Sequence, residues 1–195
     1  MGNRIATLAF LIPFVFALGL LIWKQSKFST STGEKIESSV AVDFVEKKST
    51  IASNSGNVIG LSSVIDGDTV DVDGNRIRLN GIDAPESSQT CNMAGETYRC
   101  GLHAEEFLRQ IIGSGQLDCK PLTKDRYGRI VATCWLDGRD LGMTMVANGW
   151  ALAYRQYDMV YVAQENEAYK AGLGMWAGAF VEPWLWRKGQ RLEGE

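Results

Sequence analysis

Residues 58–86 of this 195-residue chain read VIGLSSVIDGDTVDVDGNRIRLNGIDAPE. The stretch opens with a β-branched, apolar run over residues 58–65, which predicts a strand. Apolar and charged residues then alternate over residues 69–80, with the dipeptide Asp73-Gly74 in the middle. Because both residues of that dipeptide tolerate positive φ, it predicts a hairpin turn. We therefore expect three consecutive strands, the last two forming a hairpin.

The chain after this stretch mixes strands and helices. Two further strands are predicted at 116–122 and 129–136, on either side of a turn, and amphipathic spacing with glycine stops predicts helices at 101–112, 141–148 and 160–171. Five short strands interrupted and followed by about three helices indicate an α+β fold built on a small barrel. The Trp-rich end of the chain, which contains Trp176, Pro183, Trp184 and Trp186, is expected to fold back onto this barrel.

The N-terminal segment is strongly apolar. Ile5–Trp23 contains no charged residue and is bounded by Arg4 and Lys24. At 1.5 Å per residue, such a helix spans roughly 28 Å, the thickness of a bilayer core. We therefore expect one N-terminal transmembrane helix within residues 1–27. A cleaved secretory signal is the alternative, which the absence of a clear A-x-A cleavage pattern disfavours.

Residues 28–57 are rich in Ser and Thr and lack periodicity, so they are interpreted as a flexible linker. The domain that follows, residues 58–195, contains 14 Lys and Arg against 19 Asp and Glu. The whole chain has a net charge of −3. This balance excludes a broadly basic surface for nucleic acid, so an anionic substrate must be held locally. If the anionic substrate is a nucleic acid, the same balance favours short or single strands over long duplexes, because few counterions would be released.

Four carboxylates stand near one another in the deciding stretch: Asp66, Asp68, Asp83 and Glu86. Like charges at one place repel unless a cation or protons neutralise them. Hard oxygen ligands favour Ca²⁺ or Mg²⁺ over Zn²⁺. Taken alone, each acidic fragment could be a polar turn, but an arginine-bearing strand lies between them.

Three ordered motifs carry a family resemblance: Ile-Asp-Gly-Asp-Thr at 65–69, Arg-Leu-Asn-Gly-Ile-Asp-Ala-Pro-Glu at 78–86, and Asp-Arg-Tyr-Gly-Arg at 125–129. Together they resemble the thermonuclease family, the staphylococcal-nuclease-like domain, from about Val58 to Gly172. The resemblance implies an OB-type five-stranded barrel and calcium-dependent hydrolysis of DNA or RNA.

The resemblance also implies roles for the acidic residues. Asp68 and Asp83 match the calcium carboxylates, and Ala84 stands where a backbone carbonyl completes the site. Alanine replaces the family's frequent threonine there, which a main-chain ligand tolerates. Glu86 matches the carboxylate near the attacking water, and Asp66 matches an acid that supports the metal ligands.

Arg78 and Arg129 match the two phosphate-binding arginines of the family. Planar guanidinium forks suit phosphate recognition, which agrees with arginine at both positions. Aromatic side chains that stack on a base are expected near the site, and Tyr127, Tyr154 and Tyr157 are the candidates. For each tyrosine, ordinary packing is the alternative role.

The four cysteines allow three disulfide pairings. Local spacing favours Cys91 with Cys100 and Cys119 with Cys134. Zinc is disfavoured because the chain has no C-x-x-C pair and one histidine. Bridges would place the domain in an oxidising compartment, whereas reduced thiols in a cytosolic domain are the alternative.

These expectations combine into one functional hypothesis. The chain is predicted to be a calcium-dependent nuclease, anchored through residues 5–23, with its catalytic domain in the periplasm or outside the cell. Secretion after signal cleavage is the alternative location. The alternative function is a catalytically silent module that binds nucleic acid or a protein partner, and the sequence identifies no protein partner.

Overall fold

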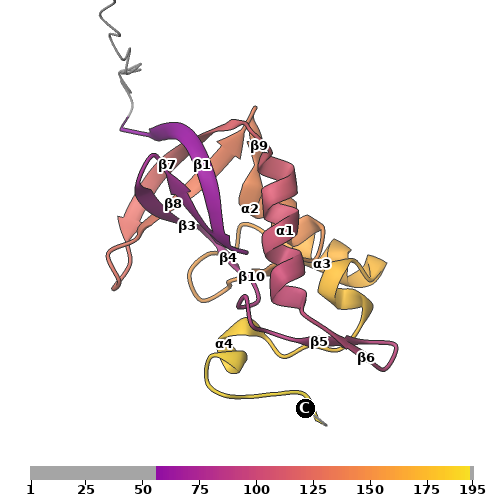
Figure 1. Cartoon of the computed structure of the whole chain (residues 1–195). Coiled ribbons are helices and arrows are strands. Elements are labelled where there is room, and N and C mark those ends of the chain that lie inside the picture. Colours follow the sequence, from indigo (N-terminus) through magenta and orange to yellow (C-terminus); the bar gives the residue numbers. More distant parts are fainter. Residues whose placement is uncertain (1–55, 194–195) are drawn as a thin grey trace, which may run out of the picture. The chain divides into compact units, whose positions relative to one another are not determined.

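The computed structural model describes residues 56–193, and its central feature is a closed barrel (Figure 1). The barrel strands are β1 (Val58–Asp66), β2 (Thr69–Val72), β3 (Asn75–Leu79), β7 (Gln116–Lys124) and β8 (Ile130–Leu136). They pair in the order β3-β2-β1-β7-β8, and the parallel pairing of β3 with β8 closes the barrel. The predicted α+β fold with a five-stranded, OB-type barrel is confirmed, with strand ends shifted by one or two residues.

Three main helices accompany the barrel: α1 (Cys100–Ile112), α2 (Leu141–Ala147) and α3 (Val162–Ala171). Each was predicted. Helix α1 lies against β1 because Ala104, Leu108 and Ile112, spaced four residues apart, form one buried face. Helix α2 begins at the N-cap Asp140, whose side chain accepts the N–H of Met143.

Several short elements were not predicted. They are β4 (Ile82–Asp83), β5 (Cys91–Met93), β6 (Glu96–Tyr98), β9 (Arg139–Asp140), β10 (Leu152–Ala153), the 3₁₀ helix η1 (Gly174–Ala177) and α4 (Pro183–Trp186). All of them are two to four residues long, too short for periodicity to reveal. Strand β10 pairs with β4 and places Leu152 opposite Asp83.

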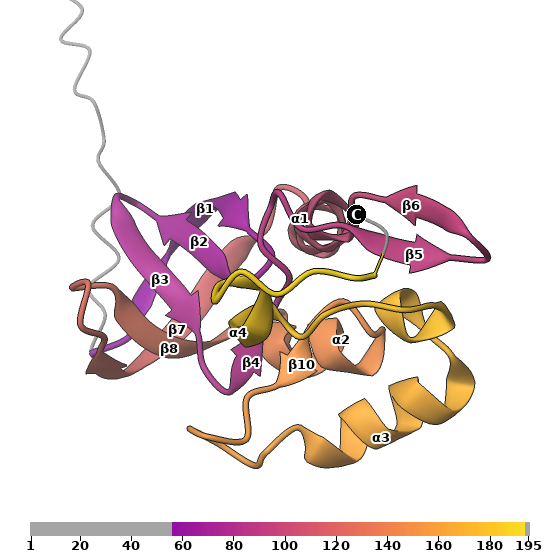
Figure 2. The ribbon, with the colours of Figure 1, turned by 90° about the horizontal axis from the view of Figure 1, so that it is seen from below.

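Two hydrophobic clusters support the candidate site. The larger fills the barrel with the alternating apolar residues of β2 and β3, such as Val70 and Ile77, which are fully buried. The smaller joins the Cys91–Cys100 pair to Leu152 and Met175. Figure 2 shows the chain after η1 returning toward the barrel and bringing α4 beside β4, as expected for the Trp-rich end.

Within residues 56–193, no helix is long and apolar enough to cross a bilayer. The predicted anchor at residues 5–23 and almost all of the predicted linker at 28–57 lie outside the described residues.

Candidate active site

Asp68 lies in the turn between β1 and β2, and its residue surface is only 4% exposed. Its carboxylate accepts hydrogen bonds from the Thr69 hydroxyl at 3.0 Å and from the Ala84 N–H at 3.3 Å. Asp66 orients the turn, because its Oδ1 accepts the N–H of Asp68 at 3.0 Å. A Cβ at Gly67 would stand 2.8 Å from the Cβ of Ala84, so glycine allows the turn and the residue after β4 to approach.

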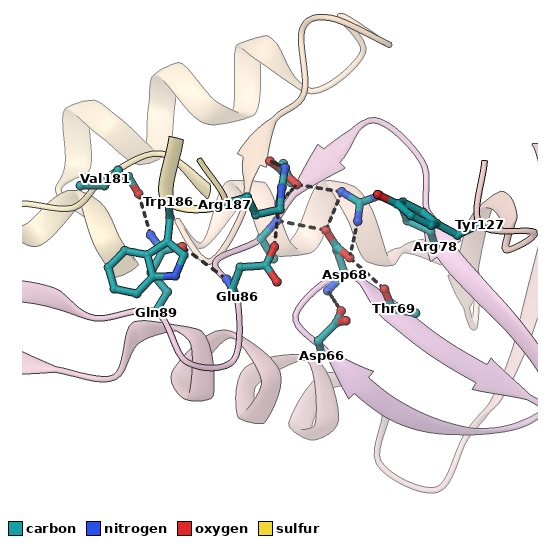
Figure 3. A network of polar contacts seen from close by, with 12 residues as sticks. Asp66, Asp68, Thr69, Arg78, Glu86, Gln89, Tyr127, Val181, Trp186 and Arg187 are labelled. Atoms are coloured by element: carbon teal, nitrogen blue, oxygen red, sulfur yellow. Dashed lines mark hydrogen bonds and ion pairs between the residues drawn. The ribbon is translucent and has the colours of Figure 1, made fainter. Parts of the chain in front are cut away.

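Arg78 joins Asp68 to Asp83. It stands opposite Thr69 in the pairing of β2 with β3, which directs its guanidinium to the end of the barrel where Asp68 lies. A single atom, Nη2 of Arg78, is 2.9 Å from Oδ2 of Asp68 and 2.7 Å from Oδ1 of Asp83. Asp83, on β4, is fully buried. The carboxylate of Asp68 in the turn and that of Asp83 on β4 therefore converge on one nitrogen. Figure 3 shows the guanidinium of Arg78 beside Asp68.

The close approach of the two carboxylates to Arg78 shifts the pKa of Asp68 and of Arg78. Burial raises the pKa of Asp68 to about 7, the positive charge of Arg78 opposes that rise, and the negative charges of Asp66 and Asp83 add to it. Burial alone would lower the pKa of Arg78, but the two aspartates outweigh it and raise that pKa. Arg78 alone does not compensate the acidic cluster, and a second guanidinium, described below, pairs with Asp83 and Glu86.

Arg129 reaches the same cluster indirectly. Its Nε donates to Oδ2 of Asp125 at 2.7 Å, and its Nη1 donates to the Thr69 hydroxyl at 3.4 Å. The other carboxylate oxygen of Asp125 accepts the N–H groups of Tyr127 and Arg129, each at 2.9 Å. Partial burial would raise the pKa of Asp125, but the bonds from Arg129 and Tyr127 outweigh it and lower that pKa. The turn motif at 125–129 thus fixes Arg129 at the edge of the site.

A functional candidate that the sequence did not reveal is Arg187, directly after α4. Its Nη2 lies 2.7 Å from Oδ2 of Asp83, and its Nη1 lies 3.1 Å from Oδ1 of Asp83 and 2.8 Å from Oε1 of Glu86. Partial burial alone would lower the pKa of Arg187, but the bonds to both acids outweigh it and raise that pKa. The Trp-rich run before it predicted packing only, and no spacing rule links residue 187 to residue 83.

The three candidate tyrosines occupy two places. Tyr127 is 69% exposed, and its ring lies under the guanidinium groups of Arg126 and Arg129, at 4.8 and 5.7 Å. Tyr154 stacks on Trp184 with ring centroids 5.9 Å apart and meets the edge of Tyr157 at 4.8 Å. Tyr154 therefore has packing partners, whereas the ring of Tyr127 is open beside an arginine of the site.

The oxygen donors fit a hard divalent cation in chemistry. Asp68 and Asp83 already approach one cationic atom of Arg78, and Ala84 is bonded to Asp68 through its backbone. Carboxylate and carbonyl oxygens are the ligands that Ca²⁺ prefers. Among residues 56–193, however, no cluster of three or more His, Cys, Asp or Glu side chains is placed to hold a metal. A cation here would depend on two carboxylates, main-chain oxygen and water.

Both predicted disulfides, Cys91–Cys100 and Cys119–Cys134, are present, and the described part of the chain has no free cysteine. Cys119 and Cys134 face each other across β7 and β8. Cys100 begins α1, immediately after the β5–β6 hairpin. The first bridge therefore joins that hairpin to the helix.

Residues 76–178 match the family described as staphylococcal nuclease homologue, which is more than half of the chain. The chain belongs to the staphylococcal nuclease family. The matched region contains Arg78, Asp83 and Arg129. It begins after Asp68 and ends before Arg187.

Several curated proteins resemble this chain. The succinoglycan biosynthesis protein ExoI of Rhizobium meliloti is 37% identical over 61% of this chain and 64% of its own length. An uncharacterized endonuclease of Escherichia coli is 34% identical over 64% of this chain and 80% of its own. The staphylococcal-like nuclease CAN1 of Arabidopsis thaliana is 35% identical over 60% of this chain. The chain spans less than two thirds of the first relative and 34% of the last.

Proposed function

We propose that this protein is a calcium-dependent nuclease that hydrolyses phosphodiester bonds in DNA, RNA or both. The observation that carries the proposal is the convergence of Asp68 and Asp83 on Nη2 of Arg78, with Glu86 and Arg129 beside them. Relatives named as endonucleases support it. Hydrolysis of a phosphodiester needs a held phosphate, an oriented water and relief of the charge that develops on oxygen.

Each requirement has residues in this site. Asp68, Asp83 and the Ala84 carbonyl would hold Ca²⁺, which when bound supplies Lewis-acid relief of charge on the phosphate. Arg78 can donate to phosphate oxygens through its planar fork. Glu86 has a half-exposed carboxylate that can orient the attacking water.

Arg129 would donate to the same phosphate as Arg78. Its Nε is held by Asp125, and its Nη1 bond to Thr69 is long at 3.4 Å, so this end of the guanidinium can turn to a substrate. The exposed ring of Tyr127 next to it offers a surface on which a base can stack. The acidic domain favours short or single-stranded substrates, because long duplexes gain affinity from many basic contacts.

We further propose that residues 5–23 tether the protein to a membrane, with the catalytic domain in the periplasm or outside the cell. The uncharged length of this segment supports a span, and the two disulfides support an oxidising compartment. Membrane fractionation with external protease digestion tests this. Recovery of the intact chain in a soluble cytosolic fraction would contradict it.

The test of the function is cleavage of a short single-stranded oligonucleotide by the full-length protein, in Ca²⁺ and in excess chelator. Cleavage should require Ca²⁺, and Asp83→Asn should abolish it. Full activity in chelator would contradict the calcium assignment. No cleavage under any condition, with retained oligonucleotide binding, would favour the silent binding module instead.

A further inference from the structure

We propose that Arg187 is a positioning residue of the nuclease site, which holds Glu86 in a fixed orientation relative to Asp83. The inference rests on the proposed function and extends it to a residue beyond the matched region of residues 76–178. Its first support is geometric. One guanidinium contacts both oxygens of Asp83 and one oxygen of Glu86, at distances between 2.7 and 3.1 Å.

Glu86 needs a positioning residue because its side chain is half-exposed to solvent. Asp83 is fully buried on β4, so its position is fixed by the fold. The Glu86 side chain is 43% exposed, and the bond from Arg187 is its one ion pair among the described residues. An exposed glutamate without a partner samples several rotamers. Arg187 removes that freedom by linking the exposed carboxylate to the buried one.

The placement of Arg187 is itself built into the fold. Gln89 is fully buried, and its amide joins two segments: Nε2 donates to the Val181 carbonyl at 2.6 Å, and Oε1 accepts the Glu86 N–H at 3.3 Å. Figure 3 shows Gln89 between these two segments. The side chain of Gln89 therefore holds the backbone of Glu86 in a fixed position relative to the segment that leads to Arg187.

A second attachment lies further back along the same segment. Asn92 and Ala179 exchange two backbone hydrogen bonds of 2.8 Å each. A Cβ at Gly178 would stand 2.1 Å from the Asn92 carbonyl oxygen, so the close approach depends on glycine. Asn92 follows Cys91, which is bonded to Cys100. The C-terminal segment is thus attached to the disulfide-bonded hairpin before it reaches the site.

Because Arg187 acts through Glu86, its loss should reduce turnover rather than substrate affinity. We expect Arg187→Ala to lower kcat by about tenfold to a hundredfold with little change in KM, as a misplaced catalytic group does. Arg187→Lys should recover only part of the rate, since an ammonium cannot bridge two carboxylates as a fork does. In a double-mutant cycle, Arg187→Ala should cost little further activity in a Glu86→Gln background.

Arg191 provides a matched control on the same segment. Its guanidinium lies 3.6 Å from the centre of the Trp186 ring, and its Nη1 donates to the Trp186 carbonyl at 3.0 Å. Arg191→Ala should keep the parent kcat. Equal losses in both alanine variants would mean that the segment is only structural, and would overturn the proposal.

The kinetic experiment uses the full-length protein with Ca²⁺ and a short single-stranded oligonucleotide. Parent kcat in Arg187→Ala would overturn the proposal, as would a raised KM with unchanged kcat, because Arg187 would then bind substrate directly. NMR of the full chain with labelled arginine tests the same contact without an activity assay. The Arg187 guanidinium signals are assigned from their loss in Arg187→Lys. Hindered rotation of the Arg187 guanidinium is expected, and free rotation would overturn the proposal. If the parent does not cleave but the rotation is hindered, the proposed function fails while the contact stands.

Discussion

Arg187 Nη2 lies 2.7 Å from Asp83 Oδ2, although 104 residues separate them in the sequence. The contact joins the C-terminal segment to a buried carboxylate at the end of the barrel. Asp83 also accepts a bond from Arg78, so two guanidinium groups share it. Removing either guanidinium leaves the buried carboxylate with one cationic partner, which costs stability.

Calcium should stabilise the folded protein. Ligands that bind only the native state raise its stability by RT ln(1 + [L]/Kd), about 2.7 kcal/mol when calcium is at 100 times its Kd. Differential scanning calorimetry with and without Ca²⁺ measures the shift in Tm. Asp83→Asn should remove the shift, and an unchanged Tm in the parent protein would contradict the calcium site.

Mg²⁺ should support less turnover than Ca²⁺, because the stricter octahedral shell of Mg²⁺ suits this donor set less well.

Gln89→Ala should destabilise the protein and slow turnover together. The variant leaves the Val181 carbonyl and the Glu86 N–H without their partner, at a cost of about 1–3 kcal/mol. Urea denaturation and a kinetic assay check the two effects. Gln110→Ala is the control, because Gln110 is exposed and, among residues 56–193, its amide bonds only to Glu106. Equal behaviour of the two variants would contradict the role of Gln89.

The carboxyl group of Asp125 should titrate below its ordinary pKa. A pKa that is lower in the folded state contributes stability above the unfolded value of about 3.9, and this contribution is lost as pH falls through the folded value. Arg129→Gln should raise the pKa of Asp125. NMR of the Asp125 carboxyl carbon across a pH titration measures this pKa. Arg126→Gln should leave it unchanged, since Arg126 bonds to Tyr127 instead. An unshifted pKa in Arg129→Gln would contradict the pairing.

Both disulfides should form in protein exported to an oxidising compartment. The mass should lie about four hydrogens below that of the fully reduced chain, and proteolysis should recover Cys91 with Cys100 and Cys119 with Cys134. Four free thiols would contradict both the pairing and the proposed location.

The barrel could be predicted from the sequence because its strands carry local signals. The alternation of Ile77 and Leu79 with arginines and the Asp73-Gly74 turn each depend on adjacent residues. The pairing of β4 with β10 could not be predicted, since each strand has two residues and neither shows a period.

The candidate site divides in the same way. Asp68, Arg78 and Asp83 stand in short motifs within 16 residues of one another, and the structure brings them together. Gln89 and Arg187 act through bonds that span 92 and 101 or more residues, for which the sequence holds no local pattern. Their roles follow only from how the C-terminal segment returns to the barrel.

The most direct measurement of the central claim compares catalysis with binding in Arg78→Ala and Arg129→Ala. Both arginines are placed to stabilise charge that develops in the transition state, so each loss should lower kcat by about 10²-fold or more. The affinity for the same short single-stranded oligonucleotide, measured in Ca²⁺, should change much less. Cleavage at the parent rate in both variants would contradict the nuclease assignment. A parent protein that never cleaves, with weakened oligonucleotide binding in both variants, would also contradict it.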